Sequence, residues 1–291
     1  MLYTPSTSQK VKERRDMKVS IIITSYNYEQ YIGETLKSVQ AQTHRDWEAI
    51  VVDDGSTDNS VNIIRRFAEA DPRIHFYQHE GGVNRGIIAT NLLALSKCTA
   101  DVVAFCESDD VLLPESIERR AKLMERYPEV VCCFSDITYT NEQLEPIIAW
   151  KPRDLPVNKP FDIRFLHTLG YEVHTFSCAM VRKAALEQCD FAPPRSSALD
   201  LWIFRQLSHF GPFCYADEPL TLFRRHGDSL SGDPINNNRA AWHRLMRDND
   251  AVIAARFPSW HLNRHLYRIL WRIRQMKQRG LAYCWGRLKR K

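Results

Sequence analysis

Short apolar runs rich in β-branched residues alternate along the chain with stretches in which apolar residues recur every three to four positions. The first kind has the length and composition of a buried strand, and the second, as in Ile32, Leu36 and Val39, has the period of an amphipathic helix. Four strands are expected in the first half: residues 18–24, 48–52, 74–78 and 101–106. This alternation predicts an α/β domain with a mainly parallel sheet.

The pattern is less regular in the second half. We expect a helix from 114 to 126, strands at 130–135 and 174–181, a helix at 199–210 and an extended segment at 219–225. The stretch from 141 to 160 contains four prolines and is expected to be a loop, a natural lid or acceptor-side insertion. A turn-rich segment then ends the main domain, which we place at residues 17–233 after a polar tail at 1–16.

A basic helical extension is predicted over residues 234–291. Lys and Arg are frequent from 251 to 291, where Asp and Glu are absent. Aromatic residues lie among these cations: Trp260, Trp271, Tyr283 and Trp285. This composition favours a helix that lies on an anionic membrane surface, and a helical hairpin that packs against the domain or a second subunit stays open.

Composition narrows the class of protein. The chain has 291 residues, 44% of them hydrophobic and 26% charged, with a net charge of +5, so it can bury a large core. No stretch approaches the roughly 20 apolar residues of a membrane span. The eight cysteines lie mostly in apolar runs without a Cys-x-x-Cys pair, which suggests reduced thiols and a cytoplasmic location. No nucleic-acid-binding module is present, so no nucleic-acid partner is expected.

Two acidic clusters follow predicted strands. Asp53 and Asp54 follow the second strand, and Glu107, Asp109 and Asp110 follow the fourth. The carboxyl ends of parallel strands meet at one edge of a sheet, so two such clusters suggest a site for a metal and a nucleotide. In an extended segment Glu107 and Asp109 would point the same way and converge on the metal, whereas Asp110 would face elsewhere.

Two common nucleotide motifs are missing. The glycine-rich stretch from Gly81 to Gly86 is followed by Ile87 and Ile88, where a P-loop requires Lys and Ser or Thr. The chain also has no Gly-x-Gly-x-x-Gly. Nucleotide hydrolysis and dinucleotide redox chemistry therefore both lose support.

Four motifs together resemble family 2 glycosyltransferases of the GT-A fold, of the bacterial surface-polysaccharide type. They are Ser20–Asn27, Val51–Asp58, Asn84–Gly86 and Glu107–Asp110 with Pro114. The resemblance covers about residues 17 to 232 and implies a Rossmann-like sheet flanked by helices. It also implies an inverting hexosyltransferase that uses Mn²⁺ or Mg²⁺ and a nucleoside-diphosphate sugar, commonly UDP-linked.

The resemblance implies an acceptor and a cellular setting as well. The acceptor would be a hydroxyl of a glycan or of a lipid-linked carrier, in the synthesis of surface polysaccharide or lipopolysaccharide. The enzyme would then work as a peripheral protein on the inner face of the cell membrane.

The donor residues are implied by the same resemblance. The nucleotide would lie against Thr24, Tyr26, Asp54 and Arg85, with Asp54 recognising the edge of the base. Glu107 and Ser108 would contact the nucleotide-sugar as well. Glu107 stands where the family usually has an Asp, which leaves its role between ribose and metal open.

The chemistry is assigned to three further residues. The resemblance makes Asp109 a metal ligand, and His226, in Phe223–Ser231, a ligand of the metal or a phosphate contact. Asp200 corresponds to the catalytic base that would take the proton of the acceptor hydroxyl, although Leu199 replaces the usual Glu and Asp200 alone resembles a helix N-cap. Two alternatives stay open: a non-catalytic glycan-binding or membrane-binding scaffold, and a metal-dependent nucleotidyltransferase.

Overall fold

The computed structural model describes residues 17–152, 155–164, 173–193, 199–227, 251–253 and 255–257. The N-terminal tail and nearly all of the predicted basic extension lie outside these residues, and so do the two alternatives for the extension. The described part contains no helix with the length and hydrophobicity that a membrane crossing requires.

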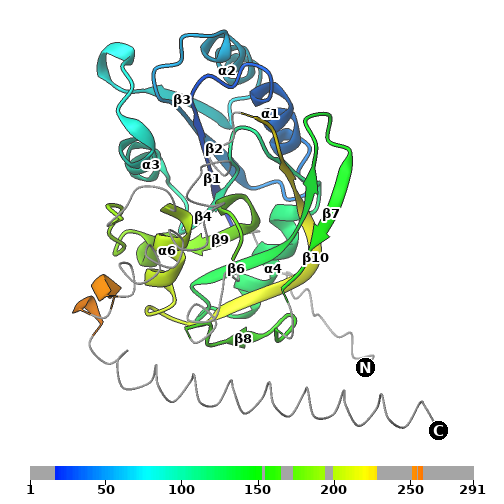
Figure 1. Ribbon diagram of the computed structural model, residues 1–291, viewed down its shortest axis with the longest axis vertical. Coiled ribbons are helices and arrows are strands. Elements are labelled where there is room, and N and C mark those ends of the chain that lie inside the picture. The colour runs from blue at the N-terminus through cyan, green and yellow to red at the C-terminus, as the bar shows by residue number, and fades with distance from the viewer. Residues whose placement is uncertain are drawn as a thin grey trace, which may run out of the picture.

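Strands and helices alternate through the first half, as the sequence predicts (Figure 1). In chain order they are β1 (Val19–Ser25), α1 (Ile32–Gln40), β2 (Trp47–Asp53), α2 (Ser60–Ala70), β3 (Ile74–Gln78), the 3-10 helix η1 (Glu80–Gly82), α3 (Gly86–Lys97) and β4 (Val102–Phe105). β1 pairs in parallel with β2 and β4, and β2 pairs in parallel with β3. The predicted parallel sheet is confirmed here.

The second half is mixed. Its elements are β5 (Val111–Leu112), α4 (Ser116–Arg126), β6 (Cys132–Thr140), β7 (Pro146–Trp150), β8 (Pro160–Phe161), η3 (Phe176–Cys178), β9 (Ala179–Arg182), α5 (Lys183–Leu186), α6 (Leu199–Leu207) and β10 (Phe213–Arg224). β9 lies antiparallel between β4 and β6, whereas β6 and β10 are parallel. The strand order is β3-β2-β1-β4-β9-β6-β10-β5, with β7 on β6 and β8 on β10.

Two sequence predictions were wrong in this half. The expected loop at 141–160 contains β7, which pairs antiparallel with β6. Its first residue is Pro146, and an edge strand tolerates proline there because no ladder hydrogen bond is lost. The expected strand at 174–181 begins only at Ala179, since the preceding residues form η3, where Cys178 N–H donates to the Thr175 carbonyl.

The alternation of side chains along the strands divides the core into two layers, one on each face of the sheet. Ile21 and Ile23 of β1 pack on one face with α1, α2 and α4, while Ile22 packs on the other with α3 and α6. With both faces covered, the central strands β1, β2 and β4 are buried along nearly their whole length. We therefore expect the functional polar side chains at the ends of the central strands.

Glu48 of β2 connects three segments through hydrogen bonds, at the end of the sheet opposite the acidic clusters. Its carboxylate accepts hydrogen bonds from Lys18 (2.8 Å), Ser20 (2.6 Å) and the Thr99 N–H (2.7 Å). Burial alone would raise the pKa of Glu48, but these hydrogen bonds outweigh it and lower the pKa to about 2. The stabilisation is therefore present above the ordinary pKa of 4.5 and is lost as the pH falls toward 2.

We expect Glu48→Gln to lower the free energy of unfolding by about 2 kcal/mol at neutral pH, because the charge-assisted hydrogen bonds are lost. The difference from wild type should shrink as the pH falls from 4.5 toward 2. Urea unfolding at several pH values measures it, with Glu69→Gln on the exposed face of α2 as control. A difference that does not change with pH would contradict this account.

Candidate active site

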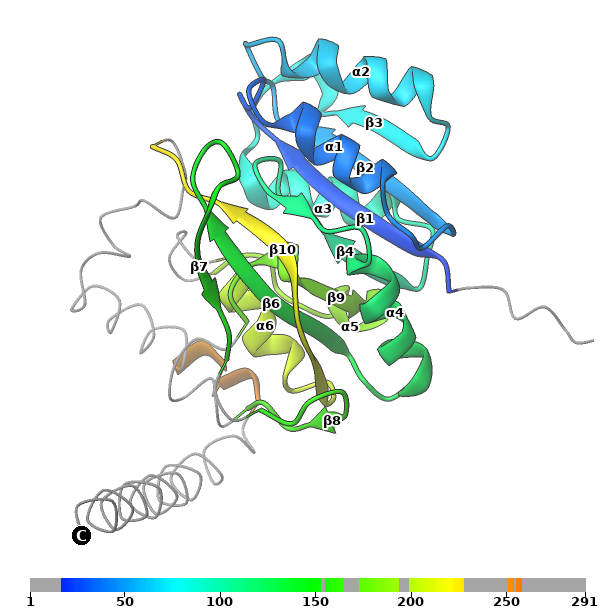
Figure 2. The ribbon, with the colours of Figure 1, turned by 90° about the vertical axis from the view of Figure 1, so that its right-hand side faces the viewer.

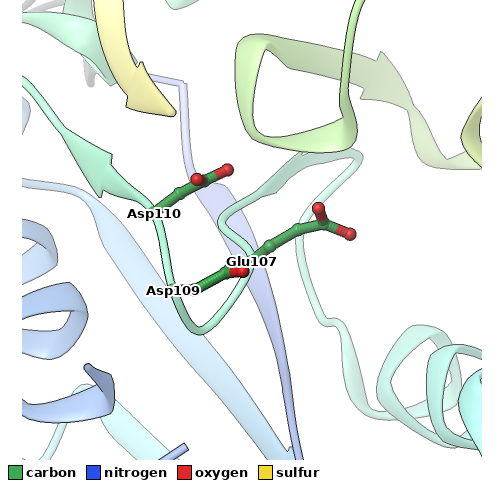
Figure 3. A group of neighbouring side chains, drawn as sticks. All are labelled: Glu107, Asp109 and Asp110. Atoms are coloured by element: carbon green, nitrogen blue, oxygen red, sulfur yellow. The ribbon is translucent and has the colours of Figure 1, made fainter. Parts of the chain in front are cut away.

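The loop after β4 gathers three carboxylates. Asp110 N–H donates to the Glu107 carbonyl (3.0 Å), which closes a turn rather than continuing the strand. Ligand oxygens of Glu107, Asp109 and Asp110 consequently lie within 4.8 Å of one another, and the three side chains project to the same side (Figure 3). The expectation that Asp110 faces elsewhere was wrong, because the i, i+2 alternation holds only for extended backbone.

Side chains from distant segments hold this acidic loop, which we define as residues 106–110. The hydroxyl of Thr35 on α1 lies 2.9 Å from the Ser108 carbonyl and 2.8 Å from the Asp110 carbonyl. From the other side, Ser177 Oγ accepts the N–H of Glu107 (2.9 Å), and Thr175 donates to the Glu107 carboxylate (3.3 Å). The loop is thus fixed between α1 and η3.

Arg224, at the end of β10, binds the loop through both its backbone and its side chain. Its Nε donates to the Asp109 carbonyl (2.8 Å), and its backbone N–H donates to the Asp110 carboxylate (3.1 Å). The guanidinium also binds the Glu142 carbonyl and the Glu34 carboxylate (2.6 Å). A buried cation therefore joins the acidic loop to the β6–β7 turn and to α1.

Burial raises the pKa values of two of these carboxylates. It raises the pKa of Glu107 to about 8, with the charges of Asp109 and Asp200 adding to the effect. It also raises the pKa of Asp110 well above its usual range, again with Asp109 adding to the effect. Within the described part, Asp110 Oδ2 is buried without a hydrogen-bond partner. A crowded set of oxygen ligands with an unused buried oxygen fits a divalent cation such as Mg²⁺ or Mn²⁺.

His226 lies against the acidic loop. Its Nε2 is 3.0 Å from Asp109 Oδ2, and its ring packs on Tyr28 (5.6 Å between centroids) and Tyr31 (4.6 Å). The structure thus brings together the two residues predicted as metal ligands. Arg224 precedes His226 by two residues in an extended segment, and this spacing was the signal in the sequence that could have identified it.

Asp200 lies in the first turn of α6, where its carboxylate accepts the Leu201 N–H (2.7 Å). Its charge contributes to the raised pKa of Glu107, so the two carboxylates are neighbours. The structure therefore places the predicted base next to the acidic loop, and its catalytic role stays a prediction.

The predicted nucleotide residues lie at the carboxyl ends of the first strands. Thr24 is half-buried in β1, and Tyr26 just beyond is 46% exposed. Asp54 accepts the backbone N–H groups of Arg85 (2.7 Å) and Gly86 (2.9 Å), at the start of α3. Asp54 thus positions the loop that carries Arg85, and its predicted contact with the base stays a prediction.

Ser108 and Gly55 show how tightly this edge is packed. Ser108 is buried, and its carbonyl accepts a hydrogen bond from the Thr35 hydroxyl. Its predicted contact with the nucleotide-sugar stays a prediction. Gly55 has φ of +78°, and a Cβ there would come within 2.6 Å of the Asn84 nitrogen. Only glycine fits this close approach of the two nucleotide-side loops.

The sequence model of glycosyl transferase family 2 matches residues 20–190, more than half of the chain. The chain therefore belongs to glycosyltransferase family 2.

Curated relatives include an uncharacterized glycosyltransferase, alr2836, of Nostoc, 39% identical over 38% of this chain and 33% of its own length. The putative teichuronic acid biosynthesis glycosyltransferase TuaG of Bacillus subtilis is 37% identical over 42% of this chain and 46% of its own. The chain thus matches less than half the length of either protein.

Solved structures share the fold. S. aureus TarS 1-349 in complex with UDP-GlcNAc superposes with a TM-score of 0.61 and 22% identity over 82% of this chain and 66% of that one. The mannosyltransferase PcManGT of Pyrobaculum calidifontis, in complex with GDP-Man and Mn²⁺, gives 0.54 and 17% over 86% and 73%. The predicted GT-A fold is confirmed.

We expect Arg224→Met to lower the free energy of unfolding by about 3 kcal/mol, because buried carbonyls lose their donor and the acidic loop loses its cation. Glu34→Gln removes only one half-exposed partner and should cost less than about 1 kcal/mol. Chemical denaturation of both variants measures the difference. Equal effects would show that Arg224 does not hold the loop.

Proposed function

We propose that this protein is an inverting, metal-dependent transferase that moves a sugar from a nucleoside-diphosphate donor, with UDP as the nucleotide, to a hydroxyl of a glycan or lipid-linked acceptor. The observation that carries the proposal is the convergence of Glu107, Asp109 and Asp110 beside His226 and Asp200 in a family 2 chain. UDP-GlcNAc in one structural neighbour supports the choice of UDP, and Mn²⁺ in the other, which holds GDP-Man, supports the choice of a divalent metal.

The acidic loop and His226 would hold the cation. Asp109 and His226 are the proposed ligands, and the unused Asp110 oxygen lies beside them. When bound, Mn²⁺ or Mg²⁺ neutralises the charge that develops on the departing diphosphate. Thr175 and Ser177 orient Glu107, and Arg224 keeps the loop backbone in place.

Asp200 is the proposed base. In a single displacement the acceptor hydroxyl attacks the anomeric carbon on the side opposite the nucleotide, so a single carboxylate that takes the hydroxyl proton suffices. Asp200 lies on α6, which Figure 1 shows on the side of β4 away from β1, β2 and β3, the strands beside which we propose that the nucleotide binds. The two roles are therefore separated in space.

The proposed setting is surface polysaccharide or lipopolysaccharide synthesis at the inner face of the cell membrane. Support comes from the sequence of residues 251–291, which combine many cations and aromatic residues with no Asp or Glu. Such a segment is suited to an anionic lipid surface, where a lipid-linked acceptor would be found.

Calorimetry with UDP tests the metal site. Wild-type protein should bind UDP much more tightly with Mn²⁺ than without it, and Asp109→Asn should abolish that difference because a charged ligand is lost. Asp101→Asn, which removes an exposed carboxylate at the other end of β4, is the matched control and should behave as wild type. Equal affinity with and without Mn²⁺ would refute metal dependence.

The base is tested by separating binding from transfer. Asp200→Asn should bind UDP as wild type does but lose about 100-fold or more in transfer, because only proton removal is impaired. UDP release from a panel of UDP-sugars, with membrane-extracted glycans as acceptors, measures transfer. Asp190→Asn, near the same helix, is the control, and near-normal turnover of Asp200→Asn would move the base elsewhere.

A further inference from the structure

An aromatic cluster lies beside the acidic loop, on the side of β4 that carries β9, β6 and β10. The Tyr139 ring centroid on β6 is 5.2 Å from that of His174 and 5.4 Å from that of Phe223 on β10. Trp150 on β7 is 5.0 Å from His174. Tyr139, Trp150 and His174 are all partly exposed, so the cluster presents flat apolar surface to solvent. β7, β6 and β10 lie side by side in Figure 2.

Arg225 adds a positive charge to this surface. At the end of β10, Arg224 and His226 reach the acidic loop, whereas Arg225 turns the other way and its guanidinium carbon lies 4.7 Å from the Tyr139 ring centroid. Arg225 is exposed and forms no salt bridge with any carboxylate of the described residues. A guanidinium that stacks on a ring and has no carboxylate partner among the described residues is suited to a carboxylate or a phosphate of a ligand.

The cluster is connected to the proposed chemistry. Thr175, which follows His174, donates to the Glu107 carboxylate (3.3 Å). Tyr139 and Trp150 pack against the core layer that α6 covers, and α6 carries Asp200. Ile148, 61% exposed, is the cross-strand partner of Tyr139 and extends the apolar surface outward. A ligand on this surface therefore lies over the core layer that α6, with the proposed base, also covers.

We infer that Tyr139, Trp150 and Arg225 form the acceptor subsite and that the acceptor is an anionic glycan. A sugar ring of the acceptor packs on the aromatic side chains, and Arg225 binds a carboxylate or phosphate on or next to that sugar. This inference rests on the proposed transferase function, and it adds the chemical class of the acceptor.

A glycan array probed with the full-length protein, UDP and Mn²⁺ tests the inference. The array carries matched oligosaccharides that differ only in a neutral, carboxylated or phosphorylated sugar. Wild type should bind acidic members more strongly than their neutral counterparts, and Arg225→Gln should lose that preference by about tenfold or more. Arg66→Gln, an exposed arginine of α2, should keep it. Trp150→Ala should weaken binding to acidic and neutral members alike.

UDP affinity, measured by calorimetry on the same variants, separates the possible failures. All variants should bind UDP as wild type does. The acceptor assignment is overturned if neutral and acidic members bind equally, if no acidic member binds, or if Arg225→Gln weakens UDP binding, which would assign Arg225 to the donor. Failure of wild type to bind UDP at all would instead overturn the proposed function. The carboxylated and phosphorylated arms identify the anionic group.

Discussion

The mutual repulsion of three carboxylates on one turn, Asp110 buried and Glu107 and Asp109 partly buried, is the constraint on which the rest of the structure depends. Glu107, Asp109 and Asp110 have ligand oxygens within 4.8 Å of one another, and burial raises the pKa of Glu107 to about 8. A loop of this kind would open unless other groups held it. Thr35, Ser177 and Arg224 do so from three separate segments, and a divalent cation would complete the set of charges.

The position of this loop divides the sheet into two working halves. β4 lies between the parallel strands β3-β2-β1 and the mixed strands β9-β6-β10. Loops on the parallel side are held together by hydrogen bonds, such as those that Asp54 accepts from the backbone of Arg85 and Gly86. The mixed side instead carries partly exposed aromatic rings and an exposed arginine. In our account the donor binds on the side of the parallel strands, and the acceptor binds on the side of the mixed strands.

The sequence predicted the parallel half well because each strand there is a buried apolar run and each helix has a clear apolar stripe. It also identified Asp109 and His226, which the fold brings to 3.0 Å. It failed where tertiary contacts decide local structure. Pro146 begins an edge strand because β6 provides a partner, and Phe176–Cys178 form a 3-10 helix from which Ser177 binds the acidic loop. The proposed role of Arg225 depends on which way its side chain points, which the sequence does not reveal.

The most direct test of the central claim is a crystal structure of the protein with UDP and Mn²⁺, with diffraction data collected at a wavelength where manganese scatters anomalously. Our account predicts an anomalous peak bounded by the side chains of Asp109, Asp110 and His226, in contact with the UDP diphosphate. Ordered UDP without a peak at the acidic loop, or a peak at some other site, would contradict it.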